Sequence, residues 1–256
     1  MRTNERFPNK LIPPYMKQKP FRVTLIIPAK NEEHNLIHVL PKIPSIVDEV
    51  LLIDGNSIDK TEELARELCP EINIIAQKGH GKGDAIREGI RRATGDIIVM
   101  LDADGSMDPE EIPDFIEPLL NGYDLVRGSR FLPGGGTSDM EMRRKLGNRF
   151  LVSLANILFG CRHSDLCYGY MAFKRDIIQK FQFESDGFEI ETELTIKALK
   201  YGLRMIEVPS YEKHRVNGNS KLRCVQDGLR IFMTILGLRL KRASESEKLF
   251  KISVPY

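Results

Sequence analysis

The chain has 256 residues, enough for one large α/β domain or two small ones, and it can bury most of its apolar surface. Its formal net charge is only +2, whereas dedicated nucleic-acid-binding proteins are usually far more basic, so we expect no nucleic-acid partner. No apolar run approaches the roughly 18 to 20 residues of a membrane-spanning helix, and four cysteines without an apolar leader predict free thiols in a reducing cytosol.

The first 20 residues form a basic, proline-containing segment. They hold four prolines and five lysines or arginines against a single glutamate, which is typical of a mobile arm. No linker or internal repeat divides residues 21–222, which we predict to be one domain. Residues 223–256 are predicted to be a C-terminal helix and tail.

Short apolar runs alternate with helical patterns in the first half of the chain. Strands are predicted at 23–27, 49–53, 72–76, 96–101 and 123–126, and helices at 32–42, 59–69, 83–94 and 109–120. Continuous apolar strands joined by helical crossovers are typical of a mostly parallel sheet with helices on both faces. We therefore predict an α/β fold of the Rossmann-like, nucleotide-binding type.

The second half has a different character. A glycine-rich stretch at 128–138 could form a lid over a site. After it we expect a helix at 143–159, a strand at 170–173, a helix at 187–201, a strand at 204–208, a basic loop at 213–223 and a last helix at 224–241.

Polar residues follow several predicted strands, at the edge where open parallel sheets bind ligands. Asp102 and Asp104 follow the fourth strand, and alternate side chains of an extended segment point to the same side. Carboxylates without a nearby His or Cys favour Mg²⁺ or Mn²⁺, ions that also bind substrate phosphates. The alternative is that these acids are turn formers, with Asp108 capping a helix that opens at Pro109.

Basic residues provide a second signal. Lys82 lies in Gly79-His-Gly-Lys-Gly83, which fits neither the phosphate loop nor the dinucleotide motif; it could approach a nucleotide or be a plain flexible turn. Several cations lie in or beside predicted loops: Arg127, Arg130, Arg143, Arg144, His214, Arg215, Lys221 and Arg223. One basic loop is usually a solvated surface, but several beside an acidic site indicate a substrate with more than one phosphate.

Together these segments resemble a family 2 glycosyltransferase of the GT-A fold, and most of all the dolichyl-phosphate mannose synthase group. The resemblance runs from about Val23 to Leu222. Its motifs, in order, are Ile26-Ile-Pro-Ala-Lys-Asn-Glu-Glu33, Asp54-Gly-Asn-Ser-x-Asp59-x-Thr61, Gly81-Lys-Gly83, Asp102-Ala-Asp104, Gly128-Ser-Arg130, Asp186-Gly-Phe-Glu-Ile-Glu191 and Arg215-x-x-Gly218-x-Ser220-Lys221. Asp54-Gly-Asn-Ser departs from the commoner Asp-Asp-Gly-Ser, and the departure falls in the segment that would lie near the base of the nucleotide.

The resemblance implies a role for each matching residue. The nucleotide-sugar site would comprise Pro28, Ala29, Asn31, Glu32, Asp54, Lys82, Asp102, Ala103, Asp104, Arg127, Arg215 and Lys221. Asp102 and Asp104 would hold the metal on the donor diphosphate, and Arg215 and Lys221 belong to a loop that would close over the donor. The implied catalytic residues are Asp104, Glu191, Arg130 and Arg143. Arg127 or Arg130, and then Arg143, would make the acceptor-side and phosphate contacts.

The implied reaction is inverting, metal-dependent transfer of a hexose from GDP-mannose or UDP-glucose to polyprenyl or dolichyl phosphate at the cytosolic membrane face. A soluble hydroxylated or phosphorylated acceptor is the alternative, because Glu189 or Glu191 could supply the base that a hydroxyl needs; their ordinary role would be the first turn of a helix. The alternative of another class is a catalytically silent nucleotide-binding module.

The C-terminal helix leaves two roles open. Its segment 229–240 is apolar but short and is flanked by Arg239, Lys241 and Arg242. It could lie on an anionic membrane surface, or it could pack against the catalytic domain or a partner subunit. A homo-oligomer is compatible with the second role.

Overall fold

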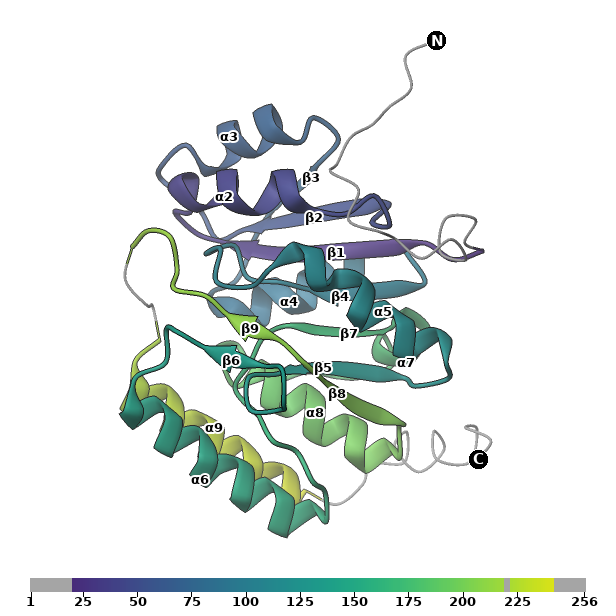
Figure 1. The fold of residues 1–256 in the computed structure, drawn as a ribbon, viewed down its shortest axis with the longest axis vertical. Coiled ribbons are helices and arrows are strands. Elements are labelled where there is room, and N and C mark those ends of the chain that lie inside the picture. The colour runs from purple at the N-terminus through teal and green to yellow at the C-terminus, as the bar shows by residue number, and fades with distance from the viewer. Residues whose placement is uncertain (1–19, 219–221, 242–256) are drawn as a thin grey trace.

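A seven-stranded sheet forms the centre of the protein in a computed structural model that describes residues 20–218 and 222–241 (Figure 1). The strand order is β3-β2-β1-β4-β7-β5-β8, and only β7 runs antiparallel to its neighbours. The strands are β1 (Val23–Ala29), β2 (Glu49–Asp54), β3 (Asn73–Ala76), β4 (Ile97–Met100), β5 (Leu125–Ser129), β7 (Met171–Lys174) and β8 (Met205–Pro209). The prediction of a mostly parallel α/β sheet is confirmed.

Helices cover both faces of this sheet, which explains why its central strands are apolar on both sides. One face packs against α2 (Glu33–Val39), α3 (Thr61–Leu68) and α5 (Ile112–Leu120). The other packs against α4 (Gly81–Arg92), the short α7 (Arg175–Ile178) and α8 (Ile190–Tyr201). Leu25 and Ile27 of β1 enter the first core and Ile26 enters the second, all three fully buried.

Two long helices form a further layer. α6 (Met142–Phe159) and α9 (Cys224–Leu240) lie side by side beyond α8 and share an apolar core with Ile196 of α8 (Figure 1). Within residues 20–218 and 222–241, none of the helices is long and apolar enough to span a bilayer. All four cysteines are free thiols, as the sequence predicts.

The predicted elements are found with small shifts at their ends. Short 3-10 segments extend two helices, at Leu40–Lys42 and Pro109–Glu111, and Asp108 caps the second by accepting the N–H of Glu110 at 3.1 Å. That cap confirms the role expected for Asp108. Pro109 is compatible with the first position of the segment because its missing N–H would have no partner there.

Two differences from the prediction affect the site. β5 continues to Ser129 and pairs with β8 as far as Pro209, so 127–129 is strand and not a loop beyond a strand end. The glycine-rich stretch contains β6 (Gly136–Thr137), which pairs with β9 (Tyr211–Glu212) in a small second sheet. This pairing fixes part of the expected lid against the segment that leads to the basic loop.

Candidate active site

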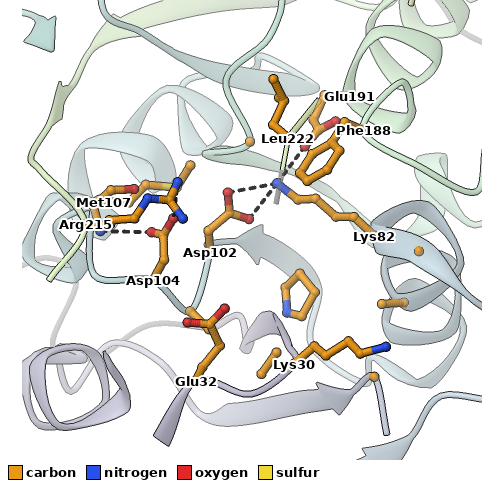
Figure 2. A pocket seen from close by; sticks show the side chains of 18 of the residues that line it. Lys30, Glu32, Lys82, Asp102, Asp104, Met107, Phe188, Glu191, Arg215 and Leu222 are labelled. Atoms are coloured by element: carbon orange, nitrogen blue, oxygen red, sulfur yellow. Dashed lines mark hydrogen bonds and ion pairs between the residues drawn. The ribbon is translucent and has the colours of Figure 1, made fainter. Parts of the chain in front are cut away.

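A cavity of about 290 Å³ lies beyond the carboxyl ends of β1, β2 and β4 (Figure 2). Segments far apart in the sequence meet there, as expected at the ligand-binding edge of an open parallel sheet. Nine of the residues predicted for the site line it: Pro28, Ala29, Glu32, Lys82, Asp102, Ala103, Asp104, Glu191 and Arg215.

The turn after β1 is held by the turn after β2. Asn31 has a positive φ of 54°, and its Oδ1 accepts the N–H of Ile58 at 2.9 Å while its own N–H donates to Ser57 Oγ at 2.9 Å. The Asn31 side chain therefore shapes the rim and does not line the cavity.

Asp54 lies just behind the cavity wall, next to Gly55, which does line it. Its Oδ2 accepts the N–H of Ser57 at 2.9 Å, and its Oδ1 is buried without a partner among the described residues. A buried carboxylate oxygen gains from a donor, but Asp54 is not among the residues that line the cavity.

Lys82 joins two carboxylates inside the cavity. Its Nζ lies 2.6 Å from Asp102 Oδ1, 2.8 Å from Asp102 Oδ2 and 2.8 Å from Glu191 Oε1. Burial acts to lower the pKa of Lys82, but the two carboxylates outweigh it and raise that pKa, so the ammonium form is held. A Cβ at position 169 would lie 2.6 Å from this Nζ, which explains the glycine there.

The pKa of the Asp102 carboxyl is raised. Burial raises its pKa to about 6, the neighbouring Asp104 and Glu191 act in the same direction, and Lys82 opposes them. Figure 2 shows Asp102 between Lys82 and Asp104. Repulsion between neighbouring acids would be relieved by a cation, which is the physical reason for expecting one at this point.

Asp104 connects the cavity to the basic loop. Its Oδ1 accepts the N–H of Ser106 at 3.0 Å, and its Oδ2 lies 3.4 Å from Nη2 of Arg215. The backbone of Lys213 also donates to Ser106 O at 2.8 Å. These two contacts join the basic loop to the segment Asp104–Ser106. Lys221 falls outside the described residues.

A divalent ion fits these residues only if the substrate supplies further ligands. In the described part of the chain, no three His, Cys, Asp or Glu side chains form a self-contained metal cluster. Asp102 and Asp104 nevertheless line one cavity, and two carboxylates completed by phosphate oxygens and water are an ordinary Mg²⁺ site.

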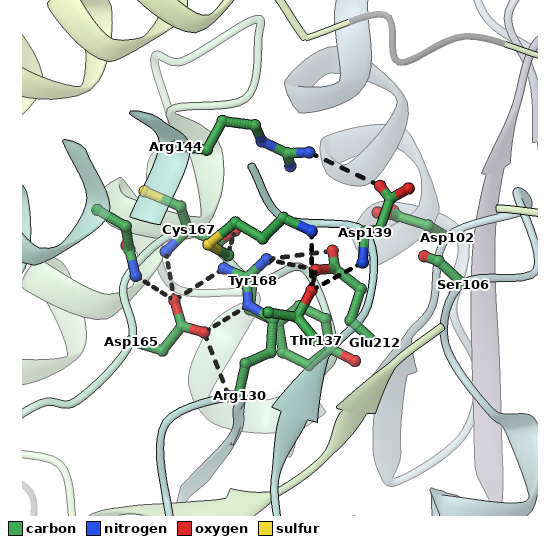
Figure 3. A network of polar contacts seen from close by, with 12 residues as sticks. Asp102, Ser106, Arg130, Thr137, Asp139, Arg144, Asp165, Cys167, Tyr168 and Glu212 are labelled. Carbon is green, nitrogen blue, oxygen red and sulfur yellow. Dashed lines mark hydrogen bonds and ion pairs between the residues drawn. The ribbon is translucent and has the colours of Figure 1, made fainter. Parts of the chain in front are cut away.

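Arg130 lies in a closed network beneath the cavity (Figure 3). Its Nε and Nη2 donate to Asp165 at 2.7 and 2.9 Å, and its Nη1 donates to both oxygens of Glu212 at 3.1 Å. Its Cζ lies over the ring of Tyr168, 4.7 Å from the ring centroid, and its side chain is 1% exposed. Arg130 therefore positions Glu212 and Tyr168, which line the cavity, and does not reach the cavity itself.

The other two predicted acceptor-side arginines also lie away from the cavity. Arg127 is fully buried within β5, because that strand continues past it, and burial lowers its pKa. It donates to Thr195 Oγ1, and its Nε and Nη2 have no partner among the described residues. Arg143 is exposed on α6, while its neighbour Arg144 lines the cavity.

Helical phase would have selected Arg144 over Arg143. Arg144 lies four and eight positions before Asn148 and Val152, both buried on the inner face of α6, and residues spaced by four share a helix face. Glu212 carried no comparable signal, because its burial depends on the unpredicted pairing of β9 with β6.

Comparison with known proteins gives the family. Residues 24–181, more than half of the chain, match the model of glycosyl transferase family 2. The chain belongs to this family. It is 32% identical over 240 residues to glycosyltransferase AglJ of Haloferax volcanii, covering 90% of this chain and 75% of the relative.

Two further relatives fall in the predicted group. Identity is 32% with the dolichol-phosphate mannosyltransferase of Pyrococcus furiosus, covering 79% of this chain and 59% of the relative. It is 30% with the polyprenol monophosphomannose synthase of Mycolicibacterium smegmatis, covering 78% and 81%. These relatives place this glycosyltransferase in the dolichyl-phosphate mannose synthase-like group of family 2.

Solved structures confirm the GT-A fold. Glucosyl-3-phosphoglycerate synthase from Mycobacterium tuberculosis, in complex with Mn²⁺, UDP and glucosyl-3-phosphoglycerate, superposes with a TM-score of 0.68 at 23% identity, covering 88% of this chain and 82% of that one. At this identity the likeness extends to the fold alone.

Proposed function

We propose that this family 2 glycosyltransferase transfers a hexose, with inversion, from a nucleoside diphosphate sugar to a polyprenyl phosphate. The observation that carries the proposal is the convergence of Lys82, Asp102, Asp104 and Arg215 on one cavity beside the Pro28–Glu32 turn. The names of the Pyrococcus and Mycolicibacterium relatives support a lipid phosphate acceptor.

The donor would lie with its nucleoside against the turns after β1 and β2. Ala29 and Gly55 line the cavity there, and the unpartnered Oδ1 of Asp54 lies behind them. The diphosphate would then reach Asp102 and Asp104, whose carboxylates would hold Mg²⁺ or Mn²⁺. When bound, such an ion stabilises the negative charge of the departing nucleoside diphosphate.

Cationic side chains complete the stabilisation of the leaving group. Arg215 lies 3.4 Å from Asp104 and lines the cavity, so its guanidinium can reach phosphate oxygens beside that carboxylate. The ammonium of Lys82 keeps Asp102 and Glu191 in place through contacts of 2.6 to 2.8 Å. Fixed charges of this kind need no reorganisation as the sugar–phosphate bond breaks.

A phosphate acceptor would be oriented by Arg144. This residue lines the cavity from α6, and its Nη1 lies 3.7 Å from Oδ2 of Asp139. An acceptor oxygen that is already anionic attacks the anomeric carbon from the side opposite the leaving diphosphate. An α-linked donor then gives a β-linked product, and the attacking oxygen needs no base.

A soluble hydroxyl acceptor is the second candidate. Glu191 and Glu212 are buried carboxylates in the cavity wall, and a carboxylate within hydrogen-bond reach could take a hydroxyl proton. However, Glu191 contacts Lys82 and Glu212 contacts Arg130. Both carboxylates already neutralise buried cations, which favours the phosphate acceptor.

A product assay distinguishes the candidates. GDP-mannose and UDP-glucose would each be supplied with Mg²⁺ or Mn²⁺ and either a short-chain prenyl phosphate or 3-phosphoglycerate. We expect a prenyl-phosphate hexose that forms from one of the donors and disappears with chelator. Product with 3-phosphoglycerate alone would establish the soluble acceptor, and no transfer with any combination would support a silent nucleotide-binding module.

A further inference from the structure

The outer face of α6 is apolar although it faces solvent. Met142, Leu146, Phe150 and Ile157 are 59 to 80% exposed. At about 3.6 residues per turn they form one stripe, opposite the buried side of the helix at Leu151 and Ala155. A helix with apolar residues on both sides is normally buried on both sides, so this stripe calls for an explanation.

The neighbouring helix α9 has the same arrangement. Val225, Leu229, Met233 and Leu240 are 59 to 86% exposed, opposite a buried side that includes Ile231. Phe150 and Phe232 stack at 6.3 Å across the pair, so the two stripes are neighbours. Of the thirteen exposed large hydrophobic residues in the described ranges, eight lie on these two helices. We call the outer faces of α6 and α9 the α6–α9 surface.

The charged residues of this surface are almost all basic. Exposed cations on or beside the helices are Arg143, Lys145, Arg149, Arg223, Arg230, Arg239 and Lys241. The helices contain a single acid, Asp227, which is 6% exposed. Two exposed acids lie beside the helices. Glu141 precedes α6, and Oε2 of Glu184 lies 2.5 Å from Nζ of Lys241 at the end of α9.

A hollow opens alongside the stripe of α6. This groove, of about 410 Å³, is lined by Phe131, Met142, Leu146 and Val152 together with the cations Lys145 and Arg149. An apolar groove bordered by cations suits a hydrocarbon chain that ends in an anionic group.

The α6–α9 surface is also close to the candidate active site. Arg144 of α6 and Ile231 of α9 both line the main cavity, and an α-helix with its side chains is only about 10 to 12 Å across. Whatever binds the outer faces of these helices is therefore about one helix diameter from the wall of the cavity.

We propose that the α6–α9 surface docks on an anionic membrane, with its apolar stripes in the interface and its cations at the lipid headgroups. This pairing of an apolar stripe with basic flanks is the pattern of helices that lie on membranes. A second copy of the chain fits less well, because a two-fold contact would bring the same basic surface against itself. This inference rests on the proposed function, because a lipid phosphate acceptor would lie in the membrane on which the surface docks.

Vesicle flotation tests the docking directly. We expect the full chain to float with vesicles of equimolar phosphatidylcholine and phosphatidylglycerol, and much less with phosphatidylcholine alone. The triple variant Leu146→Gln, Leu229→Gln, Met233→Gln should bind the anionic vesicles at least about tenfold more weakly, since it removes apolar groups from the interface. Ile58→Gln, which changes a residue that is 93% exposed but lies elsewhere, should bind like the unchanged protein.

A charge variant gives an independent measurement. Arg149→Gln with Arg230→Gln should weaken binding to the anionic vesicles about fivefold per charge, without altering the apolar stripes. Should the triple variant fail to fold, as judged by circular dichroism, this variant decides the matter.

Three outcomes would overturn the proposal. They are absence of flotation with anionic vesicles, equal flotation of the unchanged and altered chains, and a dimer by light scattering that the triple variant converts to monomer. An assay of transfer to a water-soluble, short-chain prenyl phosphate tests the proposed function separately, because that acceptor needs no membrane. Flotation without transfer contradicts the function alone, and transfer without flotation contradicts the docking alone.

Discussion

The ammonium group of Lys82 lies within 2.8 Å of both carboxylate oxygens of Asp102, although Lys82 belongs to α4 and Asp102 follows the end of β4. Glu191 completes the group, and the three side chains are 11, 26 and 5% exposed. The Lys82 cation thus balances the buried Glu191 and the partly exposed Asp102.

Replacing this cation should destabilise the fold as well as the site. We expect Lys82→Met to lower the free energy of unfolding by about 3 to 5 kcal/mol, since the buried Glu191 and the partly buried Asp102 would lose their cation. Urea denaturation at neutral pH measures this. Lys78→Met, at an exposed position four residues earlier, is the matched control and should stay within about 0.5 kcal/mol. Equal stability of the two variants would show that Lys82 does not hold the group together.

Metal-dependent donor binding should require Asp104. Thermal unfolding would be followed with UDP or GDP, with and without Mn²⁺. The unchanged protein should gain about 2.7 kcal/mol when the nucleotide is at a hundred times its dissociation constant, and most of this gain should vanish with chelator or with Asp104→Asn. Asp108→Asn is the control, because Asp108 caps a turn and contacts Lys213 outside the cavity. Persistence of the Mn²⁺-dependent gain in Asp104→Asn would remove that residue from the metal site.

The layout of the sheet could be predicted because its signal is local. Strands such as 23–27 are continuous apolar runs, and the acids that follow β4 had to lie at the ligand-binding edge once the sheet was parallel. Lys82 and Asp102 were each predicted to be near the nucleotide, but their contact was not, because it depends on how α4 meets the end of β4.

The arginines show where sequence reasoning reaches its limit. Arg130 was predicted to contact an acceptor phosphate, yet its partners Asp165 and Glu212 lie 35 and 82 positions away. Arg127 was expected in a loop, but three more residues of β5 place it in the core. Long-range partners and strand ends decide whether an arginine is a ligand contact or a buried support, and neither is a local property.

Arg143 and Arg144 lead to opposite expectations. Arg144 lines the cavity and Arg143 is exposed on the outer side of α6. With a water-soluble prenyl phosphate, we expect Arg144→Gln to lower kcat/KM about 10- to 100-fold, equivalent to about 1.4 to 2.7 kcal/mol of lost transition-state stabilisation. Arg143→Gln should change it less than about threefold. The reverse order would restore the role that the resemblance gave Arg143.

Glu193 should link the stability of the site to pH. Its oxygens accept the N–H groups of Glu184 and Ser185 and contact Lys197 at 2.7 Å, which fixes the segment leading to Phe188 on the cavity wall. Burial alone would raise the pKa of Glu193. The hydrogen bonds from Lys197 and Ser185, together with the positive charge of Lys197, outweigh burial and hold that pKa below its usual range.

The sign of the effect follows from this lowered pKa. An acid whose pKa is lower in the folded state stabilises the fold at every pH above its unfolded value, about 4.5, and loses that contribution as the pH falls through the folded value. Glu193→Gln should therefore cost about 3 to 5 kcal/mol at pH 7, where Lys197 is left buried without its acid, and progressively less below pH of about 4.5. Glu88→Gln, which breaks pairs with the solvent-exposed Arg91 and Arg92, should cost much less than Glu193→Gln. Urea denaturation between pH 3.5 and 7 measures both, and a Glu193→Gln deficit that grows towards acid pH would contradict the assignment.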